Sequence, residues 1–145
     1  MNLIETDVLY ALFDLSDVQH KVALRLFERV REGGLKASLS SLSLLELELL
    51  IRSGDILIKG KKATEGEAKE WFKDLCIALK QYNISLEILE CEDIALSAEL
   101  RFKYNLSFFD SHYAAQALRR GFNLISTDKA YDKVKGLSRV MPDSI

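Results

Sequence analysis

The stretch "FFDSHYAAQALRRGFNLISTDKAYDKV", residues 108–134, contains the pattern that decides the fold. It predicts a helix over residues 107–120 that stops at Gly121 and leads directly into a short apolar strand. The helix carries Asp110 in its first turn, and the strand delivers Asp128 just after its end. Ligands collect at the carboxyl ends of strands in parallel α/β proteins, so two acids at such junctions indicate a site.

The same alternation of short strands and helices extends upstream and downstream of this stretch. Expected strands are residues 2–5, 35–40, 84–90, 123–126 and 137–141. Expected helices are residues 8–13, a segment starting near Ser16 or Asp17, then 41–54, 67–83, 91–105 and 107–120, with a polar loop over 55–66. The chain is therefore predicted to form one domain, residues 1–145, with a three-layer α/β/α fold around a central parallel five-stranded sheet.

Composition limits the classes of function that this chain can have. Its 145 residues are 48% hydrophobic and carry a formal net charge of −2, which excludes a protein that wraps duplex nucleic acid with a broad basic surface. No stretch approaches the length of a membrane span, and the first residues lack a cleavable leader, so we expect a cytoplasmic protein. Cys76 and Cys91 lack metal-binding spacing and are expected to be buried free thiols.

Four further acids follow the first expected strand or lie in an apolar helix. Glu5 and Asp7 directly follow the first expected strand. In the apolar helix "SLSLLELELLIRS", Glu48 has Arg52 at i+4, whereas Glu46 has Leu42, Leu49 and Leu50 as helix neighbours. A carboxylate on an apolar face must protonate, find hydrogen-bond donors or bind a cation.

Asp110 and Asp128 also have purely structural explanations. "SFFD" from Ser107 is close to a capping box, in which Asp110 would bond back to the helix start. Asp128 could serve only as the N-cap of the short helix after it. A bound divalent cation would explain Glu46 together with Asp110 and Asp128.

The blocks "IETDVLYALF", "LSLLELELL" and "DSHYAAQALRRGFNLISTDKAY" together resemble the PIN domain, the fold of VapC-type toxins and other metal-dependent ribonucleases. The resemblance covers nearly the whole chain in the right order, and its last block is the most specific. It implies a metal site whose residues here are Glu5 and/or Asp7, Glu46, Asp110 and Asp128. The family's first essential acid is an aspartate, so Glu5 is a departure that extends the carboxylate by one methylene.

The resemblance implies a Mg²⁺- or Mn²⁺-dependent endoribonuclease that cuts single-stranded RNA, with a water as nucleophile. It also implies the toxin of a type II toxin–antitoxin pair, an antitoxin partner and a homodimer. Thr6 and Ser126 would orient the metal-binding carboxylates. Candidate cations for RNA binding are Arg119, Arg120 and Lys129, with Lys133, Arg101 and Lys103 as further choices, and Tyr131 or Phe109 could stack on bases.

Two other functions compete with the nuclease. A PIN-like module that binds RNA or protein without cutting would explain the departure at Glu5. A phosphate-accepting receiver domain fits poorly, because no lone acceptor aspartate follows a central strand together with a late lysine. The RNA target, the antitoxin, and the choice between Glu5 and Asp7 as first ligand stay open.

Overall fold

The computed structural model describes residues 1–145, which form a sheet of five parallel strands. The strands are β1 Asn2–Ile4, β2 Ala37–Ser40, β3 Ser85–Glu87, β4 Asn123–Ile125 and β5 Arg139–Val140. Their order across the sheet is β3-β2-β1-β4-β5, so β1 lies at the centre and pairs with both β2 and β4. The predicted parallel five-stranded sheet is confirmed.

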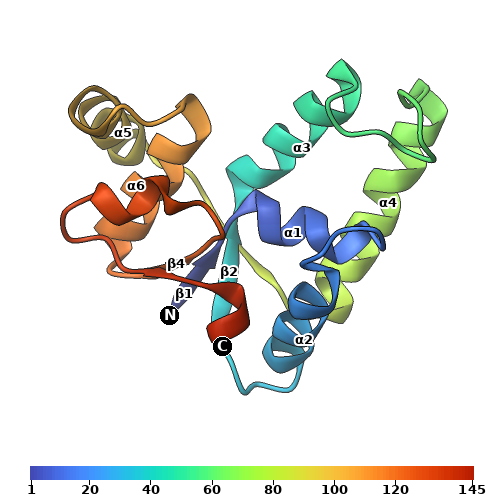
Figure 1. Cartoon of the computed structure of the whole chain (residues 1–145), viewed down its shortest axis with the longest axis horizontal. Helices are drawn as coiled ribbons and strands as arrows, with labels where there is room; N and C mark the ends of the chain where they lie inside the picture. The colour runs from blue at the N-terminus through green and yellow to red at the C-terminus, as the bar shows by residue number, and fades with distance from the viewer.

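Helices cover both faces of this sheet, and Figure 1 shows them as two groups on opposite sides. The first group is α1 Thr6–Phe13, α2 His20–Arg31, α3 Ser41–Ser53 and α4 Glu65–Gln81; the second is α5 Cys91–Tyr104 and α6 Phe108–Arg120. Two short 3₁₀ turns, η1 Lys129–Lys133 and η2 Pro142–Ser144, flank β5. This is the three-layer α/β/α arrangement that the sequence predicts.

The hydrophobic core is split by the sheet, because successive side chains of a strand point to opposite faces. In β1, Ile4 joins a cluster with the helices of the first group, whereas Leu3 joins a cluster beneath α5 and α6. Tyr113 and Tyr131 belong to the second cluster, and both are fully buried. Their hydroxyl groups therefore need partners inside the protein.

Local signals explain where α6 begins and ends. The Ser107 side chain accepts a hydrogen bond from the backbone N–H of Asp110, as an N-cap does. Gly121 follows the last turn with a φ of 64°, a left-handed conformation that glycine adopts without strain. The predicted helix and its boundaries are therefore confirmed to within one residue.

Two expectations differ from the structure. Helix α2 begins at His20, after a turn in which Asp17 accepts a hydrogen bond from the backbone N–H of Gln19, so neither Ser16 nor Asp17 is its N-cap. Cys76 and Cys91 are both exposed. They lie on the solvent side of α4 and at the start of α5, so the prediction of buried thiols is wrong.

None of the helices combines the length and the apolar composition that crossing a membrane would require.

Candidate active site

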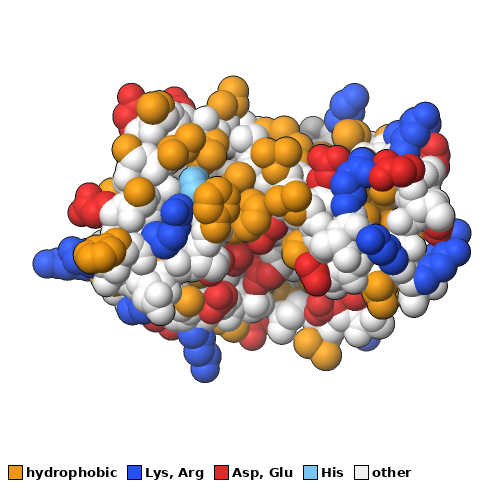
Figure 2. Space-filling view, turned by 90° about the horizontal axis from the view of Figure 1, so that it is seen from above, with side chains coloured by type: hydrophobic (Ala, Val, Ile, Leu, Met, Phe, Trp, Pro, Cys, Tyr) orange, Lys and Arg blue, Asp and Glu red, His pale blue; other side chains and the backbone are white.

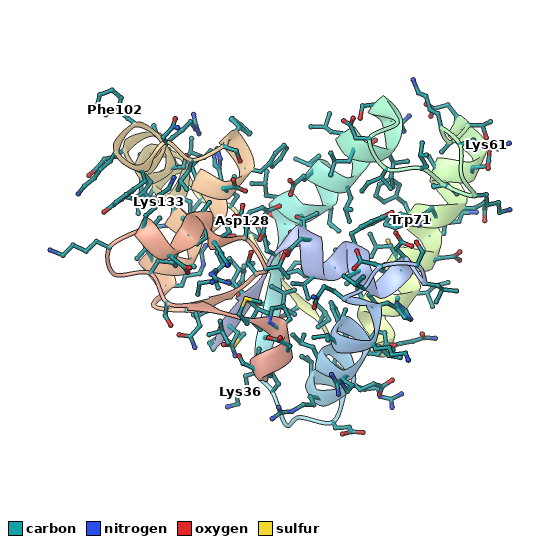
Figure 3. All side chains as sticks on the ribbon, in the orientation of Figure 1. Lys36, Lys61, Trp71, Phe102, Asp128 and Lys133 are labelled. Carbon is teal, nitrogen blue, oxygen red and sulfur yellow. The ribbon has the colours of Figure 1, made fainter.

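Acidic side chains from four separate segments lie at the carboxyl ends of adjacent strands. Glu5 follows β1, Glu46 lies in the second turn of the helix after β2, and Asp128 follows β4. Asp110 comes from the first turn of α6. Figure 3 shows Asp128 near the centre of the molecule, and in Figure 2 acidic side chains gather near the middle of the face seen from above. The fold thus brings these four segments to one region of the molecule, and a metal site formed by their acids stays a prediction.

Glu5 is the most deeply buried of these acids, with 6% of its surface exposed. Its carboxylate oxygen Oε2 is buried and has no hydrogen-bond partner. Burial raises the pKa of Glu5 well above its usual value, and the charge of Asp7 adds to that rise. A hydrogen bond from Ser126 opposes the shift, while the charges of Asp110 and Glu46 reinforce it. The group therefore lacks the positive charge that would stabilise its ionised form.

Glu46 is held by a hydroxyl group that the sequence does not reveal as functional. The hydroxyl of Tyr113 donates to Glu46 Oε2 at 2.6 Å and also lies 2.6 Å from Thr6 Oγ1. Burial raises the pKa of Glu46; the neighbouring hydroxyl groups of Thr6 and Tyr113 lower it, and the charges of Asp110 and Asp7 raise it further. The carboxylate predicted to lie unpaired on an apolar helix face is thus partly stabilised by neutral donors.

Asp110 has a similar partner, because the hydroxyl of Tyr131 donates to Asp110 Oδ1 at 3.2 Å. Burial, followed by the charges of Glu5 and Asp110, raises the pKa of the Tyr131 phenol, which therefore stays protonated. Tyr131 is fully buried, so the prediction that it stacks on RNA bases is wrong. Phe109 is partly buried and packs against the same core cluster.

Asp7 uses both carboxylate oxygens inside the protein. Oδ1 accepts from the backbone N–H of Val8 at 2.6 Å, and Oδ2 accepts from the backbone N–H of Thr127 at 3.0 Å and from its hydroxyl at 2.5 Å. Asp7 therefore ties the start of α1 to the turn that carries Asp128. This contrasts with Glu5, whose Oε2 has no partner.

The turn after β4 presents Asp128 at the surface. Asp128 Oδ1 accepts from the backbone N–H of Ala130 at 2.7 Å, so the residue does act as the N-cap of η1. The backbone N–H of Asp128 in turn donates to Ser126 Oγ at 2.9 Å. The structural explanation weighed for Asp128 is correct for one of its oxygens, and it leaves Oδ2 free for another role.

The structure does not bring Arg119 and Arg120 to the acidic side chains. Both lie in the last turn of α6, about three turns along the helix axis from Asp110. Arg119 lies 2.6 Å from Asp93 Oδ1, and Arg120 lies 3.0 Å from the same oxygen. Glu90 accepts a further bond from Arg119 at 3.0 Å. Their charges are used within the protein, so the prediction that they bind RNA is corrected; exposed Lys129, beside Asp128, remains a candidate.

Sequence reasoning missed Tyr113 and gave Tyr131 a different role, in base stacking; both look like ordinary core aromatics in "DSHYAAQAL" and "DKAYDKV". The available signal was the hydroxyl itself. A tyrosine in a segment apolar enough to be buried needs a polar partner, and the nearest polar groups in this fold are the acids at the strand ends.

These residues fit a hard divalent cation in their chemistry. Their donors are carboxylate oxygens, which Mg²⁺ and Mn²⁺ prefer. Oε2 of Glu5 has no hydrogen-bond partner that would stabilise a negative charge on it. No group of three or more His, Cys, Asp or Glu side chains lies close enough in this structure to hold a metal ion.

Comparison with known families gives one match over most of the chain. A model of the PIN domain matches residues 3–137. None of the curated proteins compared matches the chain.

Several solved structures share the fold at low sequence identity. FitAcB from Neisseria gonorrhoeae matches with a TM-score of 0.72 at 14% identity, covering 100% of both chains. VapBC2 from Rickettsia felis, bound to a DNA fragment from its promoter, matches with a TM-score of 0.69 at 14% identity, covering 97% of each chain. A toxin–antitoxin complex from Klebsiella pneumoniae matches with a TM-score of 0.65 at 18% identity, covering 98% of each chain.

Proposed function

We propose that this chain, which belongs to the PIN domain family, is a Mg²⁺- or Mn²⁺-dependent endoribonuclease that hydrolyses single-stranded RNA. PIN domains are generally nucleases. The observation that carries the proposal is the orphaned, buried Oε2 of Glu5, which faces the charges of Asp7, Asp110 and Glu46 without a basic partner. A protein retains such an arrangement where it serves a ligand, because it costs stability in the empty state.

Each acid has a distinct part in this proposal. Glu5, Glu46, Asp110 and Asp128 would hold the cation, whereas Asp7 holds the turn after β4 in place through its two engaged oxygens. When bound, the cation lowers the pKa of a water and neutralises charge on the phosphate under attack. Because water is the nucleophile, no serine, cysteine or histidine of the chain is required to form a covalent intermediate.

We favour single-stranded RNA as the substrate because the acids lie at the strand ends, and not on a broad basic surface of the kind that binds a duplex. The net charge of −2 gives no general attraction for a duplex. A flexible single strand can bring one phosphate to the acids while Lys129, next to Asp128, contacts a neighbouring phosphate. The contribution of Lys129 should therefore fall with added salt.

A toxin role in the cytoplasm, with an antitoxin partner and a homodimeric state, is the biological setting that we propose. The support is the fold shared with proteins of toxin–antitoxin complexes.

The test is cleavage of a generic single-stranded RNA by metal-free protein to which Mn²⁺ or Mg²⁺ is added. Removing a metal ligand should cost more than the about 10- to 100-fold typical of an outer hydrogen-bond partner, so Asp110→Asn should lower the cleavage rate by about 100-fold or more. Asp74→Asn, an exposed aspartate of α4, is the matched control and should retain full activity. Mn²⁺ binding without cleavage under any condition would support the competing function, a PIN-like binding module.

A further inference from the structure

Two buried tyrosines connect the four segments that carry the acids. Tyr113 comes from α6 and contacts Thr6 at the start of α1 and Glu46 in α3. Tyr131 comes from η1, just after Asp128, and contacts Asp110 in α6. We propose that Tyr113 is a positioning residue that fixes Glu46 for cation binding, and that Tyr131 does the same for Asp110. This inference rests on the proposed metal-dependent function.

The direction of the hydrogen bonds around Tyr113 follows from the number of protons available. An ionised carboxylate can only accept, so the single phenol proton of Tyr113 must go to Glu46. The 2.6 Å contact with Thr6 must then be donated by the Thr6 hydroxyl. While Glu46 is ionised, which is the form that binds a cation, Thr6 therefore donates to Tyr113 and Tyr113 donates to Glu46.

These two hydrogen bonds also explain how Glu5 and Glu46, which are distant in the sequence, keep a fixed spacing. Thr6 directly follows Glu5, so a hydroxyl bonded to Thr6 is anchored next to the first acid. The same hydroxyl holds Oε2 of Glu46, so Oε1 is the oxygen that we expect to bind the cation. A phenylalanine at position 113 would pack in the same core but would lose both bonds.

Tyr131 makes the equivalent connection on the other side of the site. Its hydroxyl donates to Oδ1 of Asp110 at 3.2 Å, so Oδ2 is the oxygen that we expect to bind the cation. Because Tyr131 lies three residues after Asp128, it fixes the distance between the turn after β4 and the first turn of α6. The two tyrosines together tie all four acid-bearing segments.

Both tyrosines are fully buried, so a purely structural role must be separated from a positioning role. The experiment is titration of metal-free protein with Mn²⁺ by calorimetry, with thermal unfolding measured on the same samples. Loss of an outer hydrogen-bond partner typically weakens metal binding by about 10- to 100-fold, so Tyr113→Phe should weaken Mn²⁺ binding by about 10-fold or more.

The matched control is Tyr10→Phe. Tyr10 also donates its hydroxyl to a carboxylate, Asp14 Oδ2 at 3.1 Å, but outside the acidic site. This variant should bind Mn²⁺ like the wild type, even if its unfolding temperature falls. Tyr131→Phe should show a weaker loss than Tyr113→Phe, because it removes one longer bond instead of two short ones.

A double-mutant cycle assigns the effect of Tyr113 to Glu46. In a Glu46→Gln background the ionised acceptor is absent, so Tyr113→Phe should cause little further loss of Mn²⁺ affinity. An equal loss in both backgrounds, or unchanged affinity in Tyr113→Phe alone, overturns the inference and leaves the proposed function standing. Absence of Mn²⁺ binding by the wild type overturns the proposed function itself. If Tyr113→Phe does not fold, the Tyr131→Phe variant with Asp110→Asn repeats the cycle.

Discussion

Two buried carboxylates, Asp93 and Glu5, lie with their acidic neighbours toward opposite ends of α6, and the two groups differ in one respect. At the last turn of the helix, Asp93 is fully buried and two arginines, Arg119 and Arg120, contact it. Near the first turn, Glu5 is 6% exposed, and no basic side chain pairs with it. The same type of side chain at similar burial is thus compensated in one place and uncompensated in the other.

The pKa values of the two groups move in opposite directions for this reason. Burial by itself would raise the pKa of Asp93, but hydrogen bonds from Arg120, from the backbone N–H of Glu90 and from Arg119 lower it below its usual value. Burial likewise raises the pKa of Glu5, and there the neighbouring charge is that of Asp7, which raises it further. We infer that the first group stabilises the fold. We infer that the second group lowers the stability of the cation-free protein and serves to bind a cation.

The largest effect that this comparison predicts is the loss of the compensated group. Asp93→Ala removes the buried carboxylate that Arg119 and Arg120 share and leaves them only the more exposed Glu90 and Glu87 as acidic partners. Breaking a buried ion pair typically costs about 3–5 kcal/mol, and partial exposure of both arginines places the expected loss of unfolding free energy near the lower end, about 3 kcal/mol.

Urea unfolding measures this loss, with Glu92→Ala, an exposed acid of the same helix turn, as control. Mn²⁺ affinity should not change, because Asp93 lies outside the site. A loss below about 1 kcal/mol for Asp93→Ala would show that the two groups do not differ in the way we describe.

A smaller effect is expected in the pH dependence of stability of the metal-free protein. The pKa of Asp93 is lowered on folding, so its contribution is present above its usual value of 3.8 and is lost as the pH falls through the folded value. The pKa of Glu5 is raised on folding, so its protonated form favours the fold, and stability is lost as the pH rises from 4.5 through the folded value.

Unfolding free energies measured across this range should therefore decline on both sides of a maximum. Saturating Mn²⁺ should reduce the decline on the alkaline side only, because a bound cation favours the ionised acids. A metal-free protein whose stability rises steadily toward neutral pH would contradict the assignment of Glu5 as uncompensated.

The sequence predicted the parts of the fold that depend on local patterns. The alternation of apolar strands with capped helices was sufficient for the five-stranded sheet, and Gly121 located the end of α6. The start of α2 was misplaced because Asp17 caps a turn rather than the helix, and both acceptors look alike in sequence. The nearness of the segments that carry Glu5, Asp7, Glu46, Asp110 and Asp128 was predictable, because parallel strands present their ends at one edge; that these acids bind a cation stays a prediction.

Tertiary pairing was not predictable in the same way. Arg119 and Arg120 look like free surface cations, and only the packing of α5 against α6 reveals that they contact Asp93. Tyr113 is separated from Glu46 by 67 residues, so no local spacing connects the two. The choice of Glu5 over Asp7 that we propose likewise rests on which oxygens are already occupied, and this is a property of the folded chain.

The smallest predicted effect tests the uncompensated group directly. Glu5→Gln removes a buried charge while keeping the size of the side chain, and burial of an unpaired polar group costs about 1–3 kcal/mol in mutational data. Because the amide still needs partners, we expect the metal-free variant to gain only about 1 kcal/mol of unfolding free energy at neutral pH, and to bind Mn²⁺ more weakly than the wild type.

Asp7→Asn provides the opposing control. Asparagine cannot accept with both terminal atoms, so this variant loses part of its contacts with Val8 and Thr127 and should be less stable than the wild type. If Glu5→Gln destabilises the metal-free protein and leaves Mn²⁺ affinity unchanged, Glu5 is a structural residue. A large loss of affinity in Asp7→Asn with retained stability would then identify Asp7 as the ligand at the end of β1. A gain of stability in Glu5→Gln and a loss in Asp7→Asn would instead mean that the two neighbouring acids have different roles. Glu5 would then bind the cation, and Asp7 would shape the turn beside it.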